Sequence, residues 1–113
     1  TVAELATHPK IVGLKDATGD ITRLKAMQKL VSDDFVLLSG DDLTSCEFLA
    51  NGGHGVISVT ANIVPKQIAD MCNAALAKDF QLAQKINKLP SYIALCLSSR
   101  IQCYLSGLCI KWG

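Results

Sequence analysis

One lysine, Lys15, stands at the end of an apolar run in the segment IVGLKDATG. Such a run is typical of a buried strand, and burial disfavours the charged form of a lysine. A neutral amine held in a fixed position is the group that forms a Schiff base with a carbonyl substrate. On spacing alone two interpretations stay open: Lys15 is a nucleophile, or it ends a strand with its ammonium group in water.

Polar residues follow two further apolar runs in the same way. The second run ends at Ser39-Gly40-Asp41-Asp42, and the third ends in the segment 58–62, which reads SVTAN. If the three runs are parallel strands, their carboxyl ends face one shared mouth, and this favours Lys15 as a nucleophile. Asp41 and Asp42 are compatible with a paired-carboxylate or metal site, but such a pair more often caps the following helix and orients a loop.

The order of the predicted elements is strand then helix, repeated three times. Apolar strands are expected over 11–15, 35–39 and 55–59, and helices over 21–31, 43–50, 65–77 and 80–88, with a further helix that ends at His8 before Pro9. Short apolar strands that alternate with helices predict a parallel sheet of the α/β class. The pattern fits part of a TIM (β/α)8 barrel or a small doubly wound sheet; a full barrel takes about 250 residues, so this chain could supply only part of one.

Composition excludes several classes of function. The chain has 113 residues, a formal net charge of +1 and 50% hydrophobic residues, which suits one small domain. We expect no nucleic-acid partner because there is no basic patch, and no membrane span because no apolar run approaches about 20 residues. The five cysteines are odd in number and form no Cys-x-x-Cys pair, so we expect a cytoplasmic protein without a metal or other cofactor. The chain does not begin with Met, which is compatible with a segment of a longer protein.

Three other features have structural interpretations. The stretch Gly52-Gly53-His54-Gly55 looks like a phosphate cradle, but it precedes a strand, so we interpret it as a tight helix-to-strand turn. His8 and His54 precede strands and are expected to be structural. Met27 and Met71 lie at helical spacing and are expected in the core.

Three blocks, GLKDATGD, LLSGDD and GGHGVISVTANIVP, resemble the dihydrodipicolinate synthase family of class I aldolases. They occur in the family's order and at its spacing, over residues 1–88. The resemblance implies that these residues correspond to about the sixth to eighth units of a (β/α)8 barrel, followed by the start of a C-terminal helical region.

The resemblance also implies roles for individual residues. Lys15 matches the lysine that forms an imine with pyruvate, after which the derived enamine attacks the aldehyde of aspartate semialdehyde, in lysine and diaminopimelate biosynthesis. Gly40 matches the floor of the pyruvate pocket, and Ile57 matches a residue whose backbone carbonyl lies next to the bound substrate. The turn Thr18–Thr22 matches a region that meets a neighbouring subunit in the family's homotetramer.

Several parts of the family's active site have no counterpart here. The resemblance places the proton-relay tyrosine and threonines and the carboxylate-binding arginine on earlier parts of the barrel, and Tyr92 and Tyr104 fall in the wrong segment. We therefore expect this chain alone to be inactive. The alternatives are another pyruvate-dependent aldolase or lyase of the same superfamily, although SGDD and SVTAN favour the synthase, and a non-catalytic remnant or interaction module.

The segment 89–113 departs from the family pattern and has no clean helical period. If the codons of 91–112 are read one base earlier, suitable codon choices give LHSALFEQSNPMLFKWALYKM, which closely resembles the family's own continuation. We therefore divide the chain into a partial barrel, 1–88, and a non-family tail, 89–113, which we expect to be out of frame.

Overall fold

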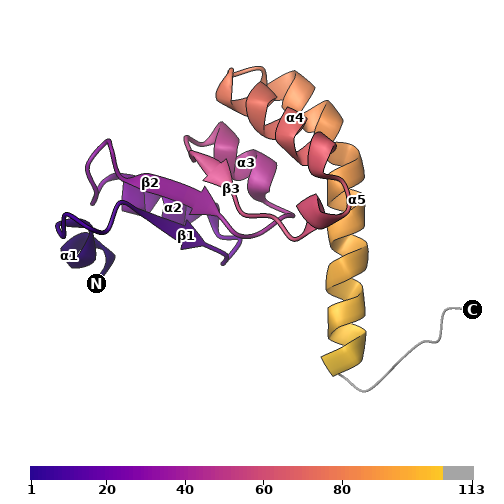
Figure 1. Ribbon diagram of the computed structural model, residues 1–113, viewed down its shortest axis with the longest axis horizontal. Helices are drawn as coiled ribbons and strands as arrows, with labels where there is room; N and C mark the ends of the chain where they lie inside the picture. The colour runs from indigo at the N-terminus through magenta and orange to yellow at the C-terminus, as the bar shows by residue number, and fades with distance from the viewer. Residues whose placement is uncertain (106–113) are drawn as a thin grey trace, which may run out of the picture.

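The computed structural model describes residues 1–105 and contains a small parallel sheet with helices packed against it (Figure 1). In chain order the elements are α1 (Val2–Ala6), β1 (Gly13–Asp16), α2 (Ile21–Gln28), β2 (Val36–Ser39), α3 (Ser45–Ala50), β3 (Gly55–Val56), the 3-10 helix η1 (Thr60–Asn62), α4 (Pro65–Leu76) and α5 (Phe80–Leu105). The predicted alternation of strands and helices is confirmed.

The three strands are parallel and lie in the order β1-β2-β3. The register pairs Lys15 with Leu38 and Ser39 with Val56, so the carboxyl ends of all three strands lie at the same edge of the sheet. This is the shared edge that the sequence predicted for its polar clusters.

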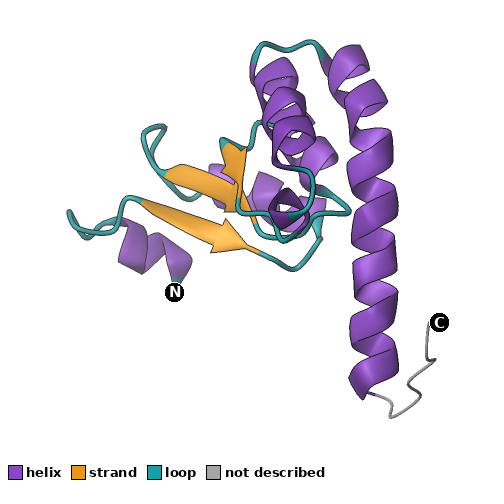
Figure 2. Cartoon of the chain, turned by 45° about the vertical axis from the view of Figure 1, so that its right-hand side comes forward, coloured by secondary structure: helices purple, strands orange, loops and turns teal. Residues whose placement is uncertain are grey.

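Two apolar clusters hold the helices to the sheet and to one another. One joins α2 and α3 to β2 and contains Leu24, Met27, Phe35, Leu37 and Phe48. The other joins α3, α4 and α5 and contains Cys46, Leu49, Met71, Ala74, Ala75 and Ala83. Figures 1 and 2 show α4 and α5 side by side beyond β3. The prediction that both methionines are core residues is confirmed, because Met71 is fully buried and Met27 nearly so.

The signals that begin and end the helices are confirmed at several positions. The Asp20 carboxylate accepts a hydrogen bond from the Thr22 backbone N–H at 2.9 Å and caps α2. Pro65 is the first residue of α4, where its missing N–H is tolerated. Gly52 follows α3 with a φ of 91°, a conformation that favours glycine, so the predicted helix-to-strand turn is confirmed.

The structure differs from the prediction after β3 and in α5. β3 ends at Val56 instead of residue 59, because the chain turns there into η1. α5 was expected to end near residue 88, but it continues to Leu105 with Pro90 inside it. Pro90 and Ala94 are buried, so packing of this stretch offsets the lost backbone hydrogen bond. The end of the predicted tail, 106–113 with Cys109 and Trp112, lies outside the described residues.

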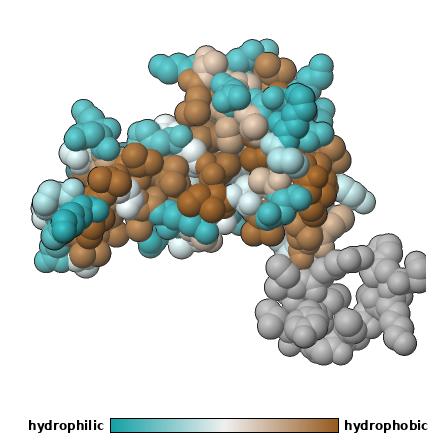
Figure 3. All heavy atoms as spheres, in the orientation of Figure 1, coloured by the Kyte–Doolittle hydropathy of each residue, from teal (hydrophilic) through white to brown (hydrophobic). Residues whose placement is uncertain are grey.

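Among residues 1–105, no helix packs on one face of the sheet, and this face is largely apolar. β1 and β2 lie in front of α2 in Figure 1, and apolar side chains form a band across this view in Figure 3. Val36 and Ile57 are 37% and 48% exposed. In the described part of the chain, no helix is long and apolar enough to cross a membrane.

Gly13 allows the close approach of β1 and β2. A Cβ atom at this position would lie 2.6 Å from the Val36 carbonyl oxygen and 2.9 Å from Val36 Cβ, so Gly13→Ala must push the two strands apart. We expect this variant to lower the free energy of unfolding by about 1–3 kcal/mol, measured by urea denaturation with circular dichroism. The matched control is Gly55→Ala, whose Cβ would lie 3.1 Å from the movable end of Leu38. If Gly13→Ala and Gly55→Ala lowered the free energy of unfolding equally, this explanation would be contradicted.

Candidate active site

Lys15 projects from β1 onto the bare face of the sheet and lies over Gly40. A Cβ atom added to Gly40 would overlap Lys15 Cε and would lie 2.9 Å from Ala17 Cβ. The aliphatic part of the lysine therefore occupies the space that a side chain at position 40 would need. Two residues that sequence reasoning placed at neighbouring strand ends are in direct contact.

Lys15 is exposed, although its strand was expected to bury it. The alternation of side chains along β1 places Asp16 on the helix-covered face, where it is buried, and Lys15 on the opposite face. Since no helix of the described chain covers that opposite face, the prediction that burial desolvates Lys15 is wrong for this chain. The interpretation of a strand-end lysine with its tip in water describes its present surroundings.

Ile57 lies beside Gly40 on the other side of β2. Its backbone N–H donates to the Ser39 carbonyl oxygen at 2.8 Å, which extends the pairing of β2 and β3 by one residue. Lys15, Gly40 and Ile57 thus come together from the ends of three adjacent strands, as the sequence predicted.

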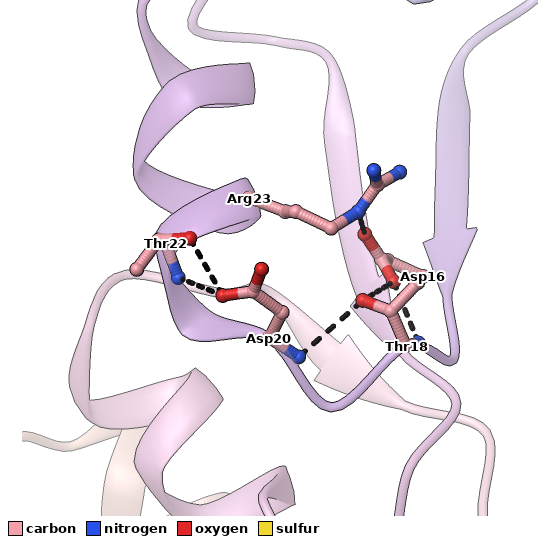
Figure 4. Close-up of polar contacts among 5 residues, drawn as sticks. All are labelled: Asp16, Thr18, Asp20, Thr22 and Arg23. Carbon is pink, nitrogen blue, oxygen red and sulfur yellow. Dashed lines mark hydrogen bonds and ion pairs between the residues drawn. The ribbon is translucent and has the colours of Figure 1, made fainter.

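Asp16 fixes the turn that follows β1 (Figure 4). Its carboxylate accepts hydrogen bonds from the Thr18 backbone N–H at 2.8 Å and the Thr18 hydroxyl at 2.6 Å, and Arg23 Nε lies 3.0 Å away. Burial raises the pKa of Asp16, but the hydrogen bonds from Thr18 and the guanidinium of Arg23 outweigh it, so this pKa lies below its ordinary value. Sequence reasoning assigned no role to Asp16; the available signal was a threonine two residues later.

Asp42 connects the loop after β2 to the turn after β3. Its Oδ2 atom accepts hydrogen bonds from the backbone N–H and the hydroxyl of Thr60, both at 2.9 Å, and Thr60 is fully buried. Asp41 accepts from the backbone N–H and hydroxyl of Thr44, at 2.9 and 2.7 Å. The two carboxylates therefore orient strand-end loops, as expected, although the N-cap residue of α3 is Thr44 and neither aspartate.

Two hollows among the described residues lie away from Lys15. One of about 260 Å³ is at the amino ends of the strands, and one of about 410 Å³ lies between α3 and α5. His54, which lines the first, accepts a hydrogen bond from the Leu37 N–H at 3.0 Å, so its predicted structural role is confirmed. No group of three His, Cys, Asp or Glu side chains within the described residues is placed to hold a metal ion.

The model of the dihydrodipicolinate synthetase family matches residues 1–104. A 4-hydroxy-tetrahydrodipicolinate synthase of Pseudoalteromonas atlantica is 73% identical over 88 residues, which cover 78% of this chain and 30% of the relative. The enzyme of the same name from Teredinibacter turnerae is 52% identical over an alignment that covers the whole of this chain and 38% of the relative. The chain thus spans about a third of the length of these curated relatives.

Solved structures show the same similarity. A dihydrodipicolinate synthase from Acinetobacter baumannii, described as chloride-inhibited and complexed with pyruvate, aligns with a TM-score of 0.80 and 43% identity over 85% of this chain and 33% of its own. The synthase from Aquifex aeolicus aligns with a TM-score of 0.81 and 29% identity over 98% of this chain and 41% of its own.

The lowered pKa of Asp16 has a consequence for stability. Because it lies below the ordinary value of 3.8, the ionised carboxylate stabilises the fold above about pH 4. This contribution is lost as the pH falls through the lowered pKa of the folded state. We therefore expect the free energy of unfolding to fall less steeply between pH 6 and acidic pH in Asp16→Asn than in the wild type. Urea titrations across this range measure the slopes.

The control for this prediction is Asp34→Asn, which removes one exposed carboxylate from a turn. It should keep the wild-type slope. A slope that is unchanged in Asp16→Asn would show that the contacts with Thr18 and Arg23 contribute nothing to the acid sensitivity of the fold.

Proposed function

The chain belongs to the dihydrodipicolinate synthetase family, and from this premise we propose that Lys15 is the amine that forms a Schiff base with pyruvate. The similarity to the solved synthases confirms the expected fold, part of a (β/α)8 barrel. In this proposal the complete reaction is the family's condensation of pyruvate with aspartate semialdehyde, and the chain supplies the edge of the barrel on which the imine forms.

The proposed chemistry begins with attack by the neutral Lys15 amine on the keto carbon of pyruvate. The resulting carbinolamine loses water to give a protonated imine, which withdraws electrons from the neighbouring methyl group. Loss of a methyl proton gives an enamine, whose carbon forms the new bond to the aldehyde of aspartate semialdehyde. Hydrolysis then releases the product and regenerates the amine.

The observation that carries this proposal is the contact between Lys15 and Gly40 at adjacent strand ends. The absent side chain at position 40 lets the aliphatic part of Lys15 lie directly against the end of β2. Ile57 adds a backbone carbonyl at the next strand end, where the family places its substrate.

We propose that the chain alone completes the imine step but does not complete the condensation. Proton transfer by a positioned side chain typically contributes about 100- to 10,000-fold to a rate. The relay tyrosine and threonines that the family uses correspond to no residue here. Activity would thus require the remaining barrel units, in a cytoplasmic homotetramer like that of the family. Another pyruvate-dependent aldolase or lyase remains the second candidate, since it would use the same lysine.

Trapping the imine tests the role of Lys15. We expect incubation with pyruvate and borohydride to add one reduced pyruvate per chain, and peptide mass spectrometry to locate it on Lys15, because this lysine lies against Gly40 at the strand ends. Lys15→Arg should abolish the adduct and Lys10→Arg, in the loop before β1, should retain it. Adducts spread over surface lysines, or none on soluble wild-type protein, would refute the proposed function and favour a non-catalytic remnant.

A further inference from the structure

The backbone ladder between β2 and β3 stops one step earlier than its geometry allows. In a parallel pair the strand that donates the N–H changes from one hydrogen bond to the next. Since the Ile57 N–H donates to the Ser39 carbonyl at 2.8 Å, the next bond should run from the Asp41 N–H to the Ile57 carbonyl. That bond is not made: among the described residues, no backbone N–H donates to the Ile57 carbonyl.

The Asp41 N–H instead donates to the Ser39 side chain. The Asp41 N–H donates to Ser39 Oγ at 3.2 Å, and the same hydroxyl donates to the Asp41 carbonyl at 3.2 Å. A serine hydroxyl can donate and accept at once, so Ser39 satisfies both backbone groups of Asp41 locally. Ser39 is only 1% exposed, so water does not compete freely for these contacts.

The missing bond between the Asp41 N–H and the Ile57 carbonyl does not result from a frayed strand end, because other contacts hold the chain on both sides of it. On the β1 side, the Gly40 N–H donates to the Asp16 carbonyl at 2.7 Å. Beyond the missing bond, the Asp42 carboxylate holds Thr60 through two hydrogen bonds of 2.9 Å. The segments on both sides of the Ile57 carbonyl are thus fixed, while no backbone N–H of residues 1–105 donates to the carbonyl itself.

We propose that Ser39 is a positioning residue for the Schiff-base chemistry: by diverting the Asp41 N–H, it keeps the Ile57 carbonyl free to accept a hydrogen bond from the ligand on Lys15. This inference rests on the proposed function. The carbinolamine offers an O–H donor and the protonated imine offers an N–H donor, and both form at Lys15 Nζ. Gly40, which lies between Lys15 and Ile57, places no side chain between them.

The ladder itself can be tested without any ligand. In the isotope-labelled 113-residue chain, NMR should detect no through-hydrogen-bond coupling between the Asp41 amide nitrogen and the Ile57 carbonyl carbon. In Ser39→Ala the coupling should appear, because the freed N–H pairs with the carbonyl. Ser39→Thr retains a hydroxyl and should again show none. Coupling in the wild type would overturn the proposal whether or not Ser39→Ala folds, and so would its absence from a folded Ser39→Ala.

Trapping with pyruvate and borohydride gives the second readout. The adduct on Lys15 should form about tenfold more slowly in Ser39→Ala, the effect of one lost hydrogen bond of about 1.4 kcal/mol. Ser39→Thr should restore the rate. Ser45→Ala, which loses another buried serine hydroxyl with a contact to the Asp42 carbonyl, should trap at the wild-type rate.

The outcomes separate this inference from the proposed function. If Ser39→Ala gains the coupling but traps pyruvate as fast as the wild type, Ser39 has no positioning role. If Ser45→Ala slows trapping as much as Ser39→Ala does, the effect is general destabilisation and the inference also fails. If no protein forms the adduct, including the wild type, the proposed function fails while the coupling still reports whether Ser39 holds the ladder open.

Discussion

The carboxylates at the strand ends hold this site together, because the backbone ladder that carries it is short. β2 and β3 pair over two residues, Ser39 with Val56 and Leu38 with Gly55, and the bond from the Ile57 N–H to the Ser39 carbonyl adds one step. Past this point the chain relies on Asp42, whose carboxylate binds the buried Thr60 across 18 residues of sequence. After β1, the Asp16 carboxylate holds the next turn through its contacts with Thr18 and Arg23. Side-chain hydrogen bonds to charged groups are stronger than neutral ones, which suits them to this task.

Because of this arrangement, the residues of the proposed chemistry need no polar side-chain contacts to hold the strand ends together. Lys15 lies over a glycine and is exposed, and Ile57 offers a backbone group, so none of the three proposed site residues contributes a polar side chain to the scaffold. The same sheet face is apolar and uncovered in the described chain. A barrel in which further units cover that face would exclude water from Lys15 and favour its neutral amine.

Sequence reasoning recovered the elements whose signals are local. The strands, the cap by Asp20 and the start of α4 at Pro65 follow from patterns within a few residues, and the parallel order of the strands implies that their carboxyl ends share one edge. It did not recover the Asp42–Thr60 contact, because nothing local reveals which of many donors a carboxylate meets 18 residues away. The length of α5 was also not predicted. Pro90 is a local signal for the end of a helix, but the packing of the buried Pro90 outweighs it. The out-of-frame origin of the tail stays a prediction.

In the site that we propose, three strand ends lie together, and the ligand on Lys15 lies over Gly40 and next to the Ile57 carbonyl. A crystal structure of the chain after trapping with pyruvate and borohydride tests this most directly. We expect continuous density from Lys15 Nζ to the reduced pyruvate, with the ligand beside Gly40 and a polar atom of the ligand within hydrogen-bonding distance of the Ile57 carbonyl oxygen. Density that leads away from β2 into solvent, with the Ile57 carbonyl paired to the Asp41 N–H, would contradict it.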